Sequence, residues 1–480
     1  MLTVLYSLAL ALVPVLGLAG AGHALLYKRD SRAAFGWIAV CLMFPLAGPL
    51  LYFVFGVNRV QTRAQRLSRR FPFSLGVGFE RGEYGETEPI VEPAGLPIDW
   101  QPLARISGTL VQRPLLEGND IEPLHNGEEA FPAMLAAIEA AETRVWLTTY
   151  IFETNRTGRR FIDALARAQE RGVDVRVLLD GVGELYAQPL AGTLLRRRGV
   201  RFARFMRPRP WPPQFHINLR NHRKILVVDA REAFIGGMNI GDRHLAEALD
   251  NPNRVIDLQF RLRGPVIAQV AAIFAEDWRF CTGEVAVPPA PEETGVFGPN
   301  ICRAFSDGPN EDLDRLAMIM ASTVSAARER VDIMTPYFIP STALVSALEA
   351  AALRGVKITV LLPERSNLPF VHWATRNLLW QLLRMGIEVY YQPAPFVHTK
   401  LFAVDGHYAL IGSANIDPRS LRLNFELTVE VFSDAFGSRV QRHVEEVAQR
   451  SKRITLDELD SRSLPVRTRD ALCWLFSPYL

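Results

Sequence analysis

The strongest constraint on the fold of this 480-residue chain is an internal repeat. Two stretches share one predicted order of elements: an amphipathic helix, a strand, a second helix and a second strand. The first occupies residues 131–179 and the second occupies residues 313–362. Because strands that alternate with helices form βαβ units, each copy predicts an α/β lobe with a mixed, largely parallel sheet flanked by helices. We expect these two tandem lobes at residues 101–300 and 301–480.

Both copies contain the pattern H-x-K-x-x-x-x-D, followed by a turn of small residues that ends in asparagine. The first copy supplies His222, Lys224, Asp229 and Asn239, and the second supplies His398, Lys400, Asp405 and Asn415. One such pattern would be weak evidence of function, because a lone histidine is usually an ordinary core or surface residue. Two copies in the same strand context, each with the same turn, indicate a shared chemical role.

The spacing within the motif assigns its side chains to faces of a strand. Residues two apart point to the same side, so each histidine shares a face with the lysine that follows it. Asp229 and Asp405 complete the candidate catalytic motif at an odd spacing, and an unbroken strand would turn them to the opposite face. We expect these aspartates to support the structure rather than to contact the substrate. Asn239 and Asn415 can offer amide donors to phosphate oxygens.

Two such faces that meet across a pseudo-twofold axis supply what phosphodiester exchange requires without a metal. One imidazole attacks phosphorus, and the other protonates the leaving alcohol and later deprotonates the incoming one. The lysines and asparagines stabilise the charge that grows on the phosphoryl oxygens. An acidic partner would fix the tautomer of each histidine, and Asp257 and Glu426, which follow the two motifs, are the candidates for that supporting role.

Residues 1–58 contain two hydrophobic runs without Asp, Glu, Lys or Arg, Leu2–Leu26 and Ala33–Val57. Each run is about 25 residues long and a bilayer span needs about 20, so the runs predict a membrane anchor of two transmembrane helices. Cleavage of the first run as a signal peptide is the alternative, although the usual basic start is missing. Residues 59–100 are expected to form a linker, basic at first and then rich in Pro and Gly. Its arginines favour a cytoplasmic catalytic domain and contact with anionic lipid headgroups.

The duplicated motif resembles the hallmark of the phospholipase D superfamily, and the similarity is closer to the bacterial cardiolipin synthases. It extends over nearly the whole chain. Residues 221–225, Asn-His-Arg-Lys-Ile, look like that family's first active-site strand. Residues 415–420 and 424–426 look like the segment after its second. The paired N-terminal runs and the ending Ser-Pro-Tyr-Leu at 477–480 also resemble that family.

The resemblance implies a phosphatidyltransferase. One phosphatidylglycerol is attacked, glycerol leaves and a phosphatidyl-histidine forms, and a glycerol hydroxyl of a second phosphatidylglycerol then takes the phosphatidyl group. By analogy His222 is the nucleophile and His398 the acid and base, although the near symmetry of the motifs leaves the opposite assignment open. No cofactor is implied, because bond exchange needs no nucleotide and the chain has no P-loop. The four scattered cysteines predict no zinc site. The implied partners are phospholipid and the bilayer of a bacterial inner membrane, which the chain would cross more than once.

Other functions fit the same residues. A phospholipase D would let water take the phosphatidyl group, and the sequence does not show whether the pocket excludes water. Phosphatidylethanolamine could replace the donor, or another alcohol the acceptor. A nuclease of the superfamily would need a basic, aromatic groove, which a net charge of only +3 does not favour, so no nucleic acid partner is expected. A non-catalytic membrane scaffold would have no use for two intact motifs.

Two further segments could contact the bilayer. The loop Arg207–Pro213 places Trp211 among prolines, and the alternative is a rigid connector. The tail Leu472–Phe476 mixes apolar and aromatic residues, and it could equally pack on the second lobe.

Overall fold

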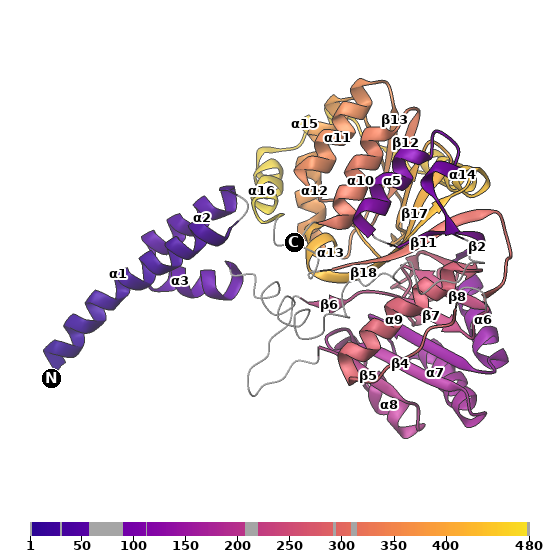
Figure 1. Ribbon diagram of the computed structural model, residues 1–480. Helices are drawn as coiled ribbons and strands as arrows, with labels where there is room; N and C mark the ends of the chain where they lie inside the picture. Colours follow the sequence, from indigo (N-terminus) through magenta and orange to yellow (C-terminus); the bar gives the residue numbers. More distant parts are fainter. Residues whose placement is uncertain are drawn as a thin grey trace. The chain divides into compact units, whose positions relative to one another are not determined.

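The computed structural model describes residues 2–28, 31–56, 90–111, 113–206, 219–290, 294–308 and 314–477 (Figure 1). They belong to two compact units, one within residues 1–71 and the other within residues 72–480. Three segments with predicted roles lie outside the described residues: the linker at 59–89 with its arginines, the loop at 207–213, and the ending at 478–480.

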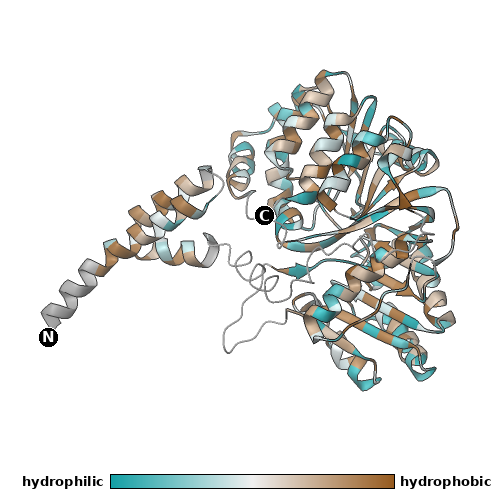
Figure 2. Ribbon diagram, viewed as in Figure 1, coloured by the Kyte–Doolittle hydropathy of each residue, from teal (hydrophilic) through white to brown (hydrophobic). Residues whose placement is uncertain are grey.

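The N-terminal unit is a helical hairpin. Its elements are α1 (Leu2–Tyr27), α2 (Ser31–Met43), α3 (Ala47–Leu51) and a π-helical turn, η1 (Tyr52–Gly56). A Cβ atom added to Gly48 would lie 2.2 Å from the carbonyl oxygen of Val40, so glycine is what allows the backbones to approach here. Nδ1 of His23 lies 2.8 Å from the hydroxyl of Tyr52. Figure 2 shows mainly hydrophobic residues along the coloured part of this hairpin.

The prediction of two transmembrane helices is wrong. Among the helices of the ranges given above, none is both long and apolar enough to cross a membrane. The second hydrophobic run shows the physical reason. α2 has only 13 residues and ends two residues before Pro45, which has no amide hydrogen to continue the helix. The chain resumes as α3, which has 5 residues.

In the unit within residues 72–480, called the catalytic unit below, the first repeat forms a mixed sheet in the order β5-β4-β3-β7-β8-β10-β2. Its strands are β2 (Leu115–His125), β3 (Arg144–Thr149), β4 (Asp174–Asp180), β5 (Phe202–Phe205), β6 (Arg220–Asn221), β7 (Ile225–Val228), β8 (Glu232–Gly236), β9 (Val255–Ile256) and β10 (Leu258–Arg263). Its helices are α6 (Asn126–Ala140), α7 (Arg156–Glu170), η3 (Gly183–Tyr186), α8 (Ala191–Arg197), η4 (Asp242–His244) and α9 (Val266–Thr282).

The second repeat forms a sheet of the same design, β14-β13-β12-β16-β17-β18-β11, and β19 pairs with β14 at its edge. Its strands are β11 (Asn300–Asp307), β12 (Arg330–Met334), β13 (Lys357–Pro363), β14 (Glu388–Gln392), β15 (Phe396–Val397), β16 (Leu401–Val404), β17 (Tyr408–Gly412), β18 (Asn424–Phe432) and β19 (Lys452–Arg453). Its helices are α10 (Arg315–Ala326), α11 (Thr342–Leu353), α12 (Pro369–Arg384), α13 (Pro418–Arg422), α14 (Asp434–Gln449), α15 (Leu456–Asp460) and α16 (Leu464–Leu475).

The sheets are less parallel than the alternating elements predict. Only β3, β4 and β5 run parallel in the described first sheet, as do β12, β13 and β14 in the second. The chain then returns through the hairpins β7–β8 and β16–β17. A tight hairpin can join only antiparallel neighbours, and these connections were too short to hold a crossover helix.

The two repeats share one sheet edge. β2 pairs antiparallel with β11, which joins the two sheets across the pseudo-twofold axis. The segment before the first repeat also crosses over: β1 (Ile90–Val91) pairs with β2, and α5 (Gln101–Val111) packs against α10 of the second repeat. A short 3-10 turn, η2 (Pro93–Gly95), connects β1 to α5. Residues 72–480 therefore form one compact body.

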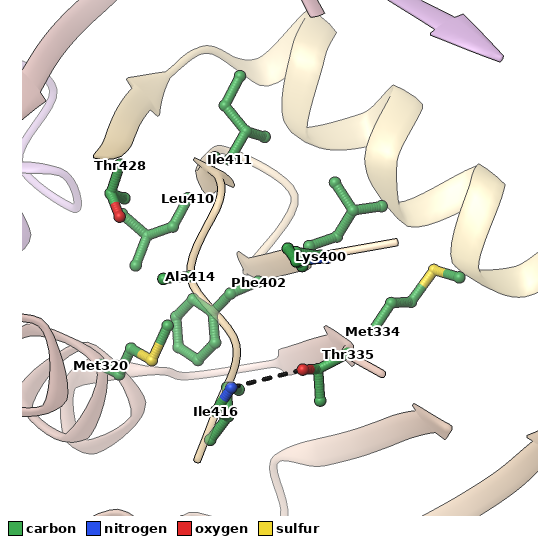
Figure 3. A pocket seen from close by; sticks show the side chains of 12 residues that line it. Met320, Met334, Thr335, Lys400, Phe402, Leu410, Ile411, Ala414, Ile416 and Thr428 are labelled. Carbon is green, nitrogen blue, oxygen red and sulfur yellow. Dashed lines mark hydrogen bonds between the residues drawn. The ribbon is translucent and has the colours of Figure 1, made fainter. Parts of the chain in front are cut away.

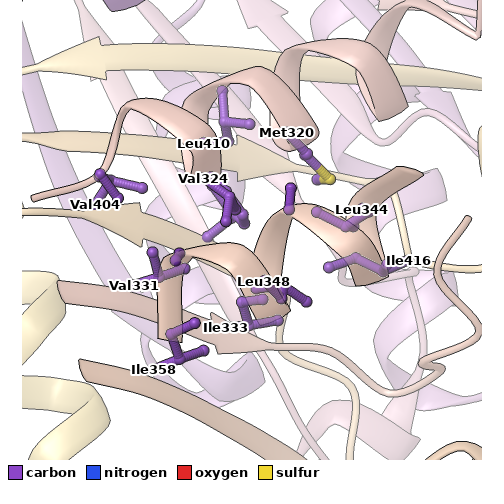
Figure 4. Packing of buried hydrophobic residues seen from close by; sticks show 14 of the residues in the cluster. Met320, Val324, Val331, Ile333, Leu344, Leu348, Ile358, Val404, Leu410 and Ile416 are labelled. Atoms are coloured by element: carbon purple, nitrogen blue, oxygen red, sulfur yellow. The ribbon is translucent and has the colours of Figure 1, made fainter. Parts of the chain in front are cut away.

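Each sheet is covered by helices on both faces. In the second repeat, Val324 of α10 and Leu348 of α11 pack on Ile333 of β12 and Leu410 of β17 (Figure 4). α14 contacts the opposite face, through β16, β17 and β18. In the first repeat α6, α7 and α8 share one core with the sheet, and α9 covers the other face. These cores fix the strand ends from which the motifs project.

Candidate active site

The segments that carry the two motif histidines are each held by the other repeat. β6 pairs in parallel with the start of β18, and the amide of His222 donates to the carbonyl of Phe425 at 2.9 Å. β15 pairs in parallel with β9, and the amide of His398 donates to the carbonyl of Ile256 at 2.7 Å. The two crossed pairings bring both motifs to one junction between the repeats.

Each histidine also contacts a carboxylate of the other repeat. Nδ1 of His222 lies 3.1 Å from the carboxylate of Glu426, and Nδ1 of His398 lies 2.8 Å from that of Asp257. A proton on Nδ1 of His222 that is donated to Glu426 leaves the Nε2 lone pair of that ring available. Both acids expected to fix a tautomer thus contact a histidine, but the acid that follows the first motif serves the second. The order of residues along the chain carries no sign of this exchange.

Glu426 is surrounded by donors. The hydroxyls of Ser413 and Ser420 donate to its carboxylate at 2.6 and 2.7 Å, and the Asn424 amide donates at 3.2 Å. Burial alone would raise the pKa of Glu426, but His222, the charge of Lys224 and the Ser413 hydrogen bond hold that pKa at about 2. The carboxylate behind His222 is therefore ionised across the physiological pH range.

Asp257 accepts fewer hydrogen bonds than Glu426 within the described residues. The Leu258 amide donates to its carboxylate at 2.9 Å. The position equivalent to Ser413 is Gly237, where an added Cβ would lie 2.5 Å from an Asp257 oxygen, so no hydroxyl can stand there. Burial raises the pKa of Asp257. The site is therefore asymmetric, with a firmly ionised carboxylate behind His222 and a more easily protonated one behind His398.

The two motif lysines are buried beside the histidines. Nζ of Lys224 donates to the carbonyl of His222 at 2.6 Å, and Nζ of Lys400 donates to the carbonyl of His398. Burial lowers the pKa of Lys224 to about 7 and that of Lys400 to about 8. Burial also lowers the pKa of both histidines, and the lysine charges lower it further. A bound anionic phosphodiester would relieve this crowding of positive charge.

Asn239 and Asn415 lie in the turns that follow β8 and β17. Oδ1 of Asn239 accepts the Ile151 amide at 3.0 Å, which leaves its side-chain N–H groups as donors. The Asn415 side chain is buried, and its Oδ1 has no hydrogen-bond partner within the described residues. Their backbone amides donate to Nε2 of His244 and to Oγ of Ser420, at 3.2 and 3.1 Å. These backbone hydrogen bonds hold both turns in place and do not use the side-chain N–H groups of the two asparagines.

Asp229 and Asp405 lie in left-handed turns just beyond β7 and β16, with φ of 53° and 51°. They are at the ends of these strands that are remote from the histidines. Each carboxylate accepts three consecutive backbone amides, those of Glu142, Thr143 and Arg144 for Asp229 and those of Arg328, Glu329 and Arg330 for Asp405. The two aspartates close the loops that enter β3 and β12, far from a substrate held between the histidines.

Replacing Asp229 by alanine should therefore destabilise the fold and leave turnover per folded molecule unchanged. The change removes the acceptor of three amides, which we expect to lower the free energy of unfolding by about 1–3 kcal/mol. Burial would raise the pKa of Asp229, but the amides of Arg144 and Thr143 lower it overall. Its stabilisation is thus full above the unfolded pKa of about 4 and is lost as the pH falls through the lower folded value. Thermal denaturation from neutral to acidic pH measures this, and Asp229→Asn, which keeps an acceptor oxygen, should cost less.

A small cavity of about 20 Å³ lies beside Lys400 in the second repeat (Figure 3). Its walls are mainly apolar and include Met320 and Phe402. Figure 3 also shows the Ile416 amide donating to Oγ1 of Thr335 at 3.4 Å, which ties the turn after β17 to the end of β12. The cavity has room for about one water molecule, so it is not the site of a lipid headgroup.

Comparison with known proteins assigns the chain to a family. The domain family described as "Cardiolipin synthase, PLD-like domain" matches residues 134–278 and 320–448, one match in each repeat. The family "Phospholipase D-nuclease N-terminal" matches residues 18–56. Cardiolipin synthase A of Pseudomonas entomophila is 32% identical over 464 residues, which is 94% of either chain. The chain belongs to the cardiolipin synthase family of the phospholipase D superfamily.

Further matches agree with this family. A cardiolipin synthase of Geobacillus kaustophilus is 31% identical and covers 95% of this chain and 90% of its own. Among solved structures, the phosphatidylserine synthase of Haemophilus influenzae gives a TM-score of 0.62 at 16% identity, covering 79% of this chain and all of its own. At that identity the match shows a shared fold. The predicted resemblance to bacterial cardiolipin synthases is confirmed.

Some residues of this cardiolipin synthase family site were missed by the motif alone. The Tyr150 ring centroid lies 5.1 Å from that of His222, and the Tyr337 ring centroid lies 6.4 Å from that of His398. Each tyrosine lies in the turn after the first strand of its copy, but Tyr337 is equivalent to Ile151 rather than to Tyr150, so the repeat alone does not pair them. His244, which supports the Asn239 turn, is fully buried, and burial lowers its pKa to about 3. No paired pattern in the sequence marks it.

Proposed function

We propose that the crossed His–carboxylate pairs catalyse the phosphatidyl transfer that makes cardiolipin, with phosphatidylglycerol as donor and acceptor. The observation that carries the proposal is the meeting of His222 and His398, with both lysines, at one buried junction of the two repeats. Two imidazoles beside two buried lysines suit a phosphodiester that is exchanged through a covalent intermediate. Relatives named cardiolipin synthase cover nearly the whole chain, which supports this choice of reaction.

In the first step, Nε2 of His222 attacks phosphorus of the donor. A P–N bond forms as the P–O bond to glycerol breaks, and the Nε2–H of His398 gives the departing oxygen a proton while Nδ1 of that ring takes one from Asp257 or Lys400. The ionised Glu426 favours His222 for the attack, because it holds the proton on Nδ1 and stabilises the cationic ring of the intermediate. Nδ1 of His398 lies 2.8 Å from Asp257 and 2.9 Å from Nζ of Lys400, so this ring can exchange a proton on one side while Nε2 serves the substrate.

In the second step, a glycerol hydroxyl of the acceptor lipid replaces the histidine. His398 removes the hydroxyl proton, the new P–O bond forms, and the P–N bond to His222 breaks. The lysines, together with Asn239 and Asn415, stabilise the charge on the phosphoryl oxygens in both steps. The number of phosphodiester bonds is the same before and after, so the exchange needs no external energy source.

A product assay tests the proposal. Purified full-length protein in liposomes receives labelled phosphatidylglycerol, and lipid products and released glycerol are followed. Cardiolipin and glycerol in equal amounts are expected. Phosphatidic acid as the main product would assign the enzyme to the hydrolases instead, and turnover only after phosphatidylethanolamine is added would change the donor.

We place the catalytic unit on the cytoplasmic surface of the bacterial inner membrane. Cys281, Cys302 and Cys473 are free, as a reducing compartment allows. α12 and α16 pack side by side (Figure 1) and expose large apolar side chains, with Phe370 62% and Leu475 70% exposed. The tail at Leu472–Phe476 has features of both alternatives, packing on the second repeat and contact with lipid. Cys473 is buried in the fold, whereas Leu472, Leu475 and Phe476 are exposed.

This apolar surface lies next to the site and carries cationic side chains. The Tyr337 hydroxyl, near His398, donates to Asn367 at 2.8 Å, and α12 begins two residues later. The Arg469 guanidinium of α16 lies 4.3 Å from the Trp373 ring centroid of α12. Aromatic and basic side chains beside exposed apolar ones are typical of a surface that rests in the headgroup region of an anionic membrane.

The double variant Phe370→Ser/Leu475→Ser should weaken binding of the protein to phosphatidylglycerol vesicles by roughly 10- to 100-fold, because burial of each side chain contributes on the order of 1.5–3 kcal/mol at most. Vesicle co-sedimentation measures the change. Leu249→Ser removes an equally apolar side chain, 83% exposed, from the first repeat and serves as the matched control. Equal binding by both variants would show that α12 and α16 do not contact the bilayer.

A further inference from the structure

A reaction that joins two phosphatidylglycerols must hold two phosphodiesters, and the histidines, lysines and asparagines above serve only the one under attack. We propose that Arg220 and Arg419, one from each repeat, form a second anion site that binds the phosphate of the acceptor lipid. This inference rests on the proposed function and adds the group that makes a phospholipid, rather than water or a simple alcohol, the preferred acceptor.

Arg220 lies beside the attacking histidine without contacting its reactive nitrogen. It occupies β6, two residues before His222, and its register partner on β18 is Asn424. Its guanidinium contacts the Tyr150 hydroxyl and lies 5.7 Å from the centroid of that ring. The centroid of the same ring lies 5.1 Å from that of His222, so Tyr150 contacts both the guanidinium and the histidine.

Arg419 approaches from the second repeat. It belongs to α13, which directly precedes β18 and follows Asn415 by a few residues. Its Nε is buried and has no hydrogen-bond partner within the described residues. Asp417, two residues earlier, interacts with the charge of Arg419, but its carboxylate accepts the backbone amides of Arg419 and Ser420 rather than Nε. A buried N–H without an acceptor is costly, and the oxygen of an incoming phosphate would remove that cost.

The two guanidinium groups lie within electrostatic reach of each other. Burial lowers the pKa of Arg419, and the charge of Arg220 lowers it further. Asp180 interacts with the charge of Arg220, and its carboxylate also accepts the backbone amides of Val182, Gly183 and Asn221. Two arginines from different elements, with planar donors that match phosphate oxygens, form a favourable arrangement once an anion lies between them.

The position of this pair also suits the geometry of the acceptor. The attacking hydroxyl of phosphatidylglycerol lies at the far end of its glycerol from its own phosphate. While that hydroxyl meets the phosphatidyl-histidine, the acceptor phosphate must therefore sit one glycerol away from the reacting phosphorus. Arg220, which contacts Tyr150 beside His222, suits this requirement, and an alcohol without phosphate would not use it.

The test separates the two half-reactions in one enzyme. Exchange of labelled glycerol into phosphatidylglycerol needs only the donor site, whereas cardiolipin formation needs the acceptor site too. We expect Arg419→Gln to lower cardiolipin formation roughly 10- to 100-fold, the loss expected for a charge-assisted phosphate contact, while glycerol exchange changes by no more than about twofold. The share of phosphatidic acid among the products should rise. Arg419→Lys, which keeps the charge but not the planar donors, should fall between wild type and Arg419→Gln.

Arg422→Gln is the matched control. Arg422 lies on the same short helix, is 56% exposed, and pairs with Asp314 at 3.0 Å, so its loss should leave both activities unchanged. Equal loss of exchange and synthesis in both Arg419 variants, or loss of neither, would overturn the acceptor site. Failure of the wild type to make cardiolipin would instead refute the proposed function, so the two outcomes are distinguishable.

Discussion

Alanine at position 222 or at position 398 is expected to lower cardiolipin formation by about four orders of magnitude or more, as in other covalent catalysts that lose a nucleophile or its acid–base partner. The reason lies in the crossed geometry. Each histidine is buried at the same junction, so neither can substitute for the other without moving a strand pair. His125→Ala changes a histidine on the exposed end of β2 and should retain full activity.

An activated donor separates the two roles. A phosphatidyl ester of p-nitrophenol has a leaving group that departs without a proton, so it needs a nucleophile but no acid. His398→Ala should then release one equivalent of p-nitrophenolate per enzyme and stop as the phosphatidyl-histidine, whereas His222→Ala should release none. A burst from His222→Ala with none from His398→Ala would reverse the assignment, and rapid-quench measurement at neutral pH decides between them.

Glu426→Gln is expected to lower turnover by about two to four orders of magnitude while the fold persists. An amide cannot stabilise the cationic ring of the intermediate, and it can present its N–H to Nδ1 of His222, which moves the ring proton to Nε2 and removes the attacking lone pair. The burst with the p-nitrophenol donor should therefore slow as much as steady-state turnover. Because Glu426 belongs to the second repeat, the loss would show directly that one repeat activates the nucleophile of the other.

Glu430→Gln gives a control on the same strand. Glu430 is also fully buried, but it pairs with Arg303 and accepts the Tyr408 hydroxyl at 3.1 Å, away from the histidines. Its loss should lower the melting temperature and leave the burst rate of the folded molecules intact. If Glu426→Gln also changed only the melting temperature, its carboxylate would have a purely structural role.

Much of this protein could be predicted from local pattern. The duplicated H-x-K-x-x-x-x-D motif, the βαβ alternation and the family follow from residues close together in the chain, where spacing alone assigns faces and elements. Spacing also separates Asp229 from His222. Hydrophobicity was a weaker guide: the uncharged run that contains Pro45 predicted one long helix, but the helix is interrupted at this proline, which lacks an amide hydrogen, and shorter helices form instead.

Only the tertiary structure decided which groups work together. Nδ1 of His222 meets a carboxylate 204 residues away, and Nδ1 of His398 meets one 141 residues away in the opposite direction. No local pattern encodes these contacts, because they depend on how the two sheets join at β2 and β11 and on the parallel pairings that cross between repeats. The same junction brings Arg220 within electrostatic reach of Arg419. The sequence by itself determined the chemical groups and their repetition, and the packing of one repeat against the other determined their partners.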